Sequence, residues 1–129
     1  MSLISIILAT VLSQGLGALW YSPLMFSSQW LKCVGKTVDD LTTSNLPYVV
    51  AMFSDLALAI ITNIAIMYVN FGSALATITM VTVGVTVLDM ALEAPHYAFE
   101  GRTLGLFGIT VGHNIARIFM MASLMYVRG

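Results

Sequence analysis

Residues 46–69 read LPYVVAMFSDLALAIITNIAIMYV, and this stretch decides the class of fold. It holds one charged side chain, Asp55, within a long apolar run. An α-helix needs about 20 apolar residues to cross the hydrocarbon core of a bilayer. We expect Asn45 or Ser44 to cap this helix, with Pro47 in its first turn. The stretch therefore predicts a membrane-spanning helix.

Three further stretches have the same character, at residues 2–21, 73–94 and 103–127. Hydrophobic residues make up 59% of the 129-residue chain and charged residues 9%. Soluble domains carry roughly a quarter charged residues, and disordered chains are poor in apolar ones, so both classes are excluded. We predict an all-α membrane protein, a single domain over residues 1–129 with four transmembrane helices in a compact bundle. Residues 27–45 are its polar loop, which we expect to begin with a short interfacial helix around Trp30.

Four spans place both chain termini on one side of the membrane, here called the terminus side. The other side, called the loop side, carries Lys32, Lys36 and Arg102, whereas the terminus side carries only Arg128. The positive-inside rule places the loop side in the cytoplasm or its organellar equivalent. We expect a cytoplasmic-type inner membrane, either the bacterial plasma membrane or the mitochondrial inner membrane. A net charge of −1 gives no basic surface for nucleic acid.

Two stretches have distinctive sequences. Residues 17–26 read GALWYSPLMF and are followed by Trp30, and residues 96–113 read HYAFEGRTLGLFGITVGH. Both resemble the domain of unknown function 1761 family, which consists of small, mostly bacterial membrane proteins. The resemblance covers nearly the whole chain. It implies a four-helix membrane fold, and it implies no activity, because none is assigned to the family.

Asp55, Asp89, His113 and Arg117 lie within the predicted spans and form a candidate intramembrane polar cluster. Ionisable residues inside a membrane are costly, so each is a functional candidate. His113 and Arg117 share a helix face because they are four residues apart. We predict that Asp55 pairs with Arg117 and that Asp89 pairs with His113. Two interpretations are open, a proton or ion relay and buried ion pairs that fix the order of the helices.

A transport path should show polar residues toward both membrane faces. The terminus-side halves of the predicted helices are almost purely apolar, apart from Ser13, Gln14 and Asn63. This pattern favours the structural interpretation of the buried charges over the relay.

A second polar group lies between the third and fourth spans, where we expect Glu93, His96, Glu100 and Arg102 to pair at the membrane surface. The Glu-x-x-His spacing of Glu93 and His96 matches di-iron carboxylate bundles, but such a site needs the motif twice. We therefore predict no metal and no cofactor. Cys33 is the only cysteine, which excludes an internal disulfide. A membrane enzyme using Glu93, His96 and Glu100 is a third hypothesis, but no catalytic motif supports it and we expect no enzyme.

Small residues recur along one face of the fourth span: Gly101, Gly105, Gly108, Gly112 and Ala116. Such stripes let membrane helices approach closely. The stripe is predicted to pack against a helix of the same chain or against another subunit. The expected partners are membrane lipid and either other membrane protein subunits or further copies of this chain.

The chain has almost no soluble mass, few charges and no recognisable catalytic set. We therefore predict an accessory or structural subunit of a larger membrane assembly, such as an energy-transducing inner-membrane complex. The alternative is a small oligomeric proton or ion transporter that uses Asp55, His113 and Arg117.

Overall fold

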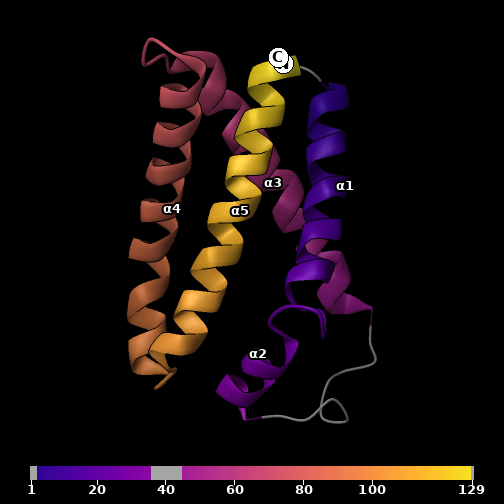
Figure 1. Ribbon diagram of the computed structural model, residues 1–129, viewed down its shortest axis with the longest axis vertical. Coiled ribbons are helices and arrows are strands. Elements are labelled where there is room, and N and C mark those ends of the chain that lie inside the picture. Colours follow the sequence, from indigo (N-terminus) through magenta and orange to yellow (C-terminus); the bar gives the residue numbers. More distant parts are fainter. Residues whose placement is uncertain (1–2, 36–44, 129) are drawn as a thin grey trace.

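The computed structural model describes residues 3–35 and 45–128, which form five α-helices and no strand (Figure 1). Four helices are long and apolar enough to cross a membrane: α1 (Leu3–Trp20), α3 (Leu46–Tyr68), α4 (Ala74–Phe99) and α5 (Leu104–Arg128). The short helix α2 (Ser27–Val34) follows α1 and contains Trp30, as expected. The all-α fold with four candidate spans is confirmed, and the chain is a membrane protein.

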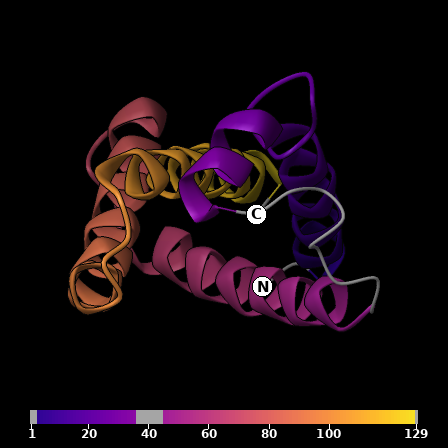
Figure 2. The same ribbon diagram turned by 90° about the horizontal axis from the view of Figure 1, so that it is seen from below.

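The four long helices run alternately up and down (Figure 1). The start of α1, the end of α5 and the α3–α4 connection lie at one end of the bundle, while α2 and the α4–α5 turn lie at the other. Helix α5 is central, since it packs against α1, α3 and α4, as Figure 2 shows from below. Arg102 and α2 thus lie at the same end of the bundle, as the topology requires. Lys36 lies outside the described residues.

The turn between α3 and α4 is as short as the sequence indicates. Ser73 caps α4, because its Oγ accepts the N–H of Ala76 at 3.1 Å. Asn70 Oδ1 accepts the N–H of Gly72 at 2.9 Å, and Gly72 has a φ of +92°, which glycine adopts without strain. These contacts reverse the chain within the five residues between Tyr68 and Ala74, so that α3 and α4 run antiparallel.

The predicted end of the third span at Ala94 is wrong, because α4 continues through Pro95 to Phe99. Proline removes one backbone donor, and helices in membranes tolerate this where local contacts satisfy the freed carbonyl. The true stop is Gly101, whose φ of +69° is left-handed. Its N–H donates to Ala98 O at 3.3 Å, and the next N–H, from Arg102, donates to Tyr97 O at 3.0 Å. This is the Schellman pattern of a helix C-terminus.

Two small apolar clusters hold the bundle together. Ile6, Ala9, Ala59, Met121 and Met125 join α1, α3 and α5, while Ile78, Val81 and Ala122 join α4 to α5. Most other large apolar side chains are exposed on the outer surfaces of the helices. A soluble domain does not expose apolar area on this scale, whereas a lipid-facing bundle does.

Candidate functional site

A carboxylate on α3 and a guanidinium on α5 form an ion pair inside the bundle. Arg117 Nη1 donates to Asp55 Oδ1 at 2.7 Å, so this predicted pair is confirmed. Two side chains of α1 complete the coordination of the carboxylate: Ser13 Oγ donates to Oδ1 at 2.7 Å, and Gln14 Nε2 donates to Oδ2 at 2.5 Å. Only 5% of the Asp55 side chain is exposed. Three donors thus surround a buried carboxylate.

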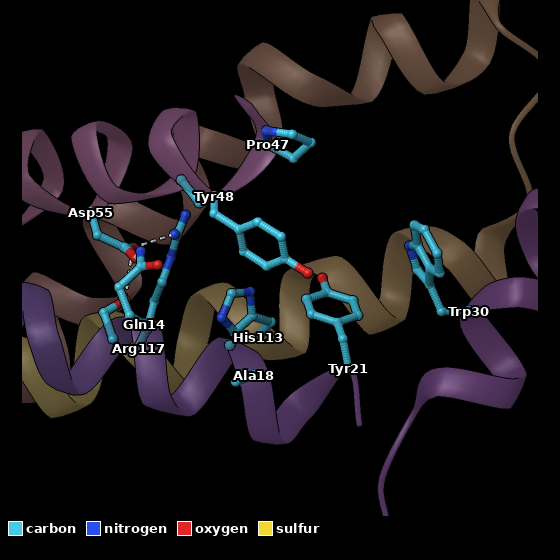
Figure 3. A pocket seen from close by; sticks show the side chains of 12 residues that line it. Gln14, Ala18, Tyr21, Trp30, Pro47, Tyr48, Asp55, His113 and Arg117 are labelled. Atoms are coloured by element: carbon cyan, nitrogen blue, oxygen red, sulfur yellow. Dashed lines mark hydrogen bonds and ion pairs between the residues drawn. The ribbon is translucent and has the colours of Figure 1, made fainter. Parts of the chain in front are cut away.

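A cavity of about 630 Å³ leads to this ion pair from the loop side (Figure 3). Asp55 and Arg117 lie at its inner end, and Tyr21, Trp30 and Tyr48 lie toward its outer end. Asp55 follows Leu46, the first residue of α3, by nine positions, so the cavity reaches about 13 Å along the helix. The volume is in the range of small-molecule sites, roughly 300–1,000 Å³.

The outer end of the cavity is aromatic. The ring of Tyr21 contacts that of Trp30 edge-on, with centroids 6.0 Å apart. Figure 3 shows the hydroxyl ends of Tyr21 and Tyr48 pointing toward one another. Burial is the largest cause of a pKa of Tyr21 above its ordinary value, so this phenol stays protonated near neutral pH. The mouth therefore presents phenol hydroxyl groups among aromatic rings.

His113 forms part of the cavity wall and does not pair with Asp89, which corrects the second predicted pair. Asp89 accepts instead from Asn114 Nδ2 at 2.5 Å. Consecutive residues of a helix point about 100° apart, so Asn114 faces α4 while its neighbour His113 faces α1. The His113 ring lies edge-on to Tyr21 at 5.3 Å, and its buried Nε2 has no hydrogen-bond partner among the described residues.

The end of α1 packs unusually closely on α5. A Cβ added to Gly112 would lie 2.9 Å from Cζ2 of Trp20, and one added to Gly17 would lie 3.5 Å from His113 Nε2. The Trp20 indole N–H donates to the backbone carbonyl of Ile109 at 3.1 Å. The two distinctive sequence stretches therefore meet in space and together build one wall of the cavity. The sequence did not reveal this contact, although a tryptophan and a glycine stand in those stretches.

An apolar layer closes the inner end of the cavity. Ala59, Ala9 and Met121 lie four residues from Asp55, Ser13 and Arg117 along their helices, on the terminus side, and all three are fully buried. One helical turn of apolar packing thus separates the ion pair from the rest of the bundle.

Buried polar groups reappear beyond this layer. Thr62 and Asn63 follow Asp55 by seven and eight positions, and both are buried. Asn63 Nδ2 contacts Met125 Sδ at 3.2 Å. Thr62 Oγ1 and Asn63 Oδ1 have no hydrogen-bond partner among the described residues. The terminus-side interior is therefore more polar than the sequence pattern indicates.

The predicted cluster of four loop residues forms only in part. Arg102 Nε pairs with Glu100 at 2.5 Å, and the guanidinium lies 5.1 Å from the centroid of the Tyr97 ring. Glu93 and His96 are exposed, and neither side chain makes a hydrogen bond or ion pair with a described residue. The reason is that α4 continues past both residues, so they stay on its outer surface, short of the turn.

Within the described residues, the predicted stripe of small residues, Gly101, Gly105, Gly108, Gly112 and Ala116, does not pack along one neighbouring helix. Gly101 belongs to the turn before α5. A Cβ on Gly105 would lie 3.5 Å from Cys33 Sγ of α2, and Gly112 receives Trp20. Ala116 is half-buried, whereas Gly108 is exposed with open space around it. Of the five residues, Gly105 and Gly112 have close contacts with other helices among the described residues.

Comparison with known proteins gives one match. The family model described as "Protein of unknown function (DUF1761)" matches residues 4–126 of this chain. No curated protein and no solved structure shows a match to it. The match includes every residue of the cavity and both distinctive stretches.

Proposed function

The chain belongs to the DUF1761 family, and because that description assigns no activity, we propose from the geometry of the site that the protein is a small membrane carrier. Its loading site is the cavity between α1, α3 and α5. The observation that carries this proposal is a cavity of about 630 Å³ that ends on a buried ion pair, Asp55 and Arg117. A solute bound there would contact the ion pair of Asp55 and Arg117 directly.

A purely structural ion pair would be expected to be packed on all sides. Burying two charges costs desolvation free energy, which good geometry and further hydrogen bonds must offset. Asp55 has such partners, but the cavity reaches Arg117, whose side chain remains 21% exposed and whose Nε lacks a partner among the described residues. A charge left open to a cavity supports a binding role.

The layering of the bundle also supports a carrier. A carrier must keep its site closed to one side while the site is open to the other. The apolar layer of Ala9, Ala59 and Met121 supplies that closure on the terminus side, and Thr62 and Asn63 supply polar groups beyond it. Opening this layer would expose the ion pair to the terminus side.

The test is the accessibility of the apolar layer. In a Cys33→Ser background, Ala59→Cys in sealed vesicles should react slowly with a membrane-impermeant maleimide added on the terminus side. The reaction is expected because a carrier must visit a state in which this layer opens. A protein that stays folded and whose Ala59→Cys never reacts from the terminus side contradicts the proposal.

The accessory-subunit role remains a second proposal. One observation favours it: Gly108 is exposed on the central helix, and apart from the backbone of its own helix no described atom lies within 4 Å of the position of a Cβ. A neighbouring subunit could pack closely there. The test is the native mass after mild extraction, measured for wild type and for Gly108→Leu, which should disturb a contact at this position. If the extracted wild-type protein has the native mass of a single chain, 13.9 kDa, this role is contradicted.

A further inference from the structure

Two residues that line the cavity each have a side-chain nitrogen without a hydrogen-bond partner in the described part of the chain. Arg117 Nε and His113 Nε2 are both buried and lack a hydrogen-bond partner there. A guanidinium nitrogen can only donate, and the imidazole nitrogen donates in one of its two neutral tautomers. The carboxylate of Asp55, in contrast, already accepts from three donors. Buried donors are normally paired, so the cavity suits a ligand that brings acceptor oxygen atoms.

The other residues that line the cavity indicate which chemical groups the rest of that ligand should carry. Its walls include Gly17, Ala18, Pro47 and Ala51, and Trp30 stands at the mouth. These residues offer apolar contact, and the rings of Tyr21 and Tyr48 add further aromatic contact near the mouth. The planar guanidinium of Arg117 matches the geometry of a carboxylate. A small acid with an apolar or aromatic body fits both parts of the cavity.

Charge conservation then links the ligand to Asp55. The empty site is neutral, because one carboxylate balances one guanidinium. A bound organic anion alone would make the site carry a net negative charge inside the membrane, which is costly. We propose that the cavity binds a small organic monocarboxylate on Arg117 and that Asp55 takes up one proton as it binds. This inference rests on the proposed loading site and names its substrate class.

The exchange is balanced. The ion pair between Asp55 and Arg117 opens, the ligand carboxylate replaces Asp55 on the guanidinium, and one proton from the loop-side water joins the Asp55 carboxylate. The site is neutral before and after. The titratable or charged groups that share the cavity with Asp55 are Arg117 and His113 of α5, Tyr48 of α3, and Tyr21 after α1. From α1 itself, Asp55 meets only Ser13 and Gln14, which do not titrate.

Benzoate is the probe for this proposal, and benzamide is its neutral counterpart. Purified wild-type protein in mild detergent should bind benzoate, with quenching of Trp fluorescence through Trp30, and should take up one proton per benzoate from weakly buffered solution. Benzamide should bind at least about tenfold more weakly, because it lacks the charge that pairs with Arg117. Asp55→Asn should still bind benzoate but should take up no proton. Arg117→Lys should bind at least about tenfold more weakly, because it loses the planar pair of donors.

A matched pair of variants separates the cavity from binding of benzoate to the micelle. Ala51→Phe fills the cavity and should abolish binding, whereas Ala94→Phe, on an exposed position of α4, should not change it. Benzoate binding without proton uptake by wild type overturns the coupling. Equal binding of benzamide, or no binding of benzoate, overturns the substrate class. If benzoate binds with proton uptake but Ala59→Cys does not react from the terminus side, this inference is supported and only the proposal of a carrier is contradicted.

Discussion

Replacing Asp55 by Asn should destabilise the bundle strongly when Arg117 is present and weakly when it is not. Breaking a buried ion pair by removing one partner costs about 3–5 kcal/mol, and an unpaired charge at the centre of a span costs about 2.5–3.5 kcal/mol on insertion scales. Because the Arg117 side chain is 21% exposed to the cavity, the lower end applies. We expect Asp55→Asn alone to cost about 3 kcal/mol of unfolding free energy.

The double variant Asp55→Asn with Arg117→Leu removes both charges, so only the weakened hydrogen bonds from Ser13 and Gln14 should be lost, at about 1 kcal/mol. Reversible unfolding in mixed micelles of wild type, both single variants and the double variant measures the coupling between the two sites. Asp89→Asn is the control, because its partner Asn114 carries no charge. Single-variant losses that simply add in the double variant would refute the energetic coupling.

Three further predictions follow from the close contacts and the topology. Gly112→Ala should lower the free energy of unfolding by about 1–3 kcal/mol, because the added methyl group overpacks against Trp20. Gly108→Ala, in open space, should raise it by up to about 1 kcal/mol through helix propensity. Equal effects of the two variants in the same unfolding assay would contradict the contact between Gly112 and Trp20. Gly101→Ala should cost about 1–2 kcal/mol, because a φ of +69° is unfavourable for alanine, and an unchanged melting temperature would argue against the left-handed turn. In a Cys33→Ser background, Ser28→Cys and Thr103→Cys should both label from the same side of sealed vesicles, and labelling from opposite sides would refute the four-span topology.

The sequence predicts the spans well because apolar runs of this length have few alternative structures. It also predicts the pair of Asp55 and Arg117, since a long arginine side chain can reach several ångströms along its helix and an unpaired charge inside a membrane is costly. It fails for His113, because depth alone does not fix the direction in which a side chain points around its helix. A shift of one position along α5 changes whether a side chain faces α1 or α4. Asn114 faces α4 and contacts Asp89 in place of His113.

The cavity itself was beyond prediction from the sequence. Its shape depends on how closely α1 approaches α5, which is set by Trp20 against Gly112. Ser13 and Gln14 did carry a signal, as adjacent polar residues in an otherwise apolar run, but their partner lies some 40 residues away, on α3. The end of α4 was misplaced because Pro95 is a frequent stop signal in water, whereas the membrane-spanning helix continues to the turn at Gly101.

The central claim is that a water-accessible cavity leads from the loop side to the ion pair, and thiol reactivity in sealed vesicles tests it most directly. Ala51 lines the cavity, and Ala94 is exposed on α4 without lining it; both lie five residues from the loop-side end of their helix, at about 8 Å depth. In a Cys33→Ser background, Ala51→Cys should react with a membrane-impermeant maleimide from the loop side much faster than Ala94→Cys, which faces lipid. Equal, slow reaction of the two cysteines would contradict the account.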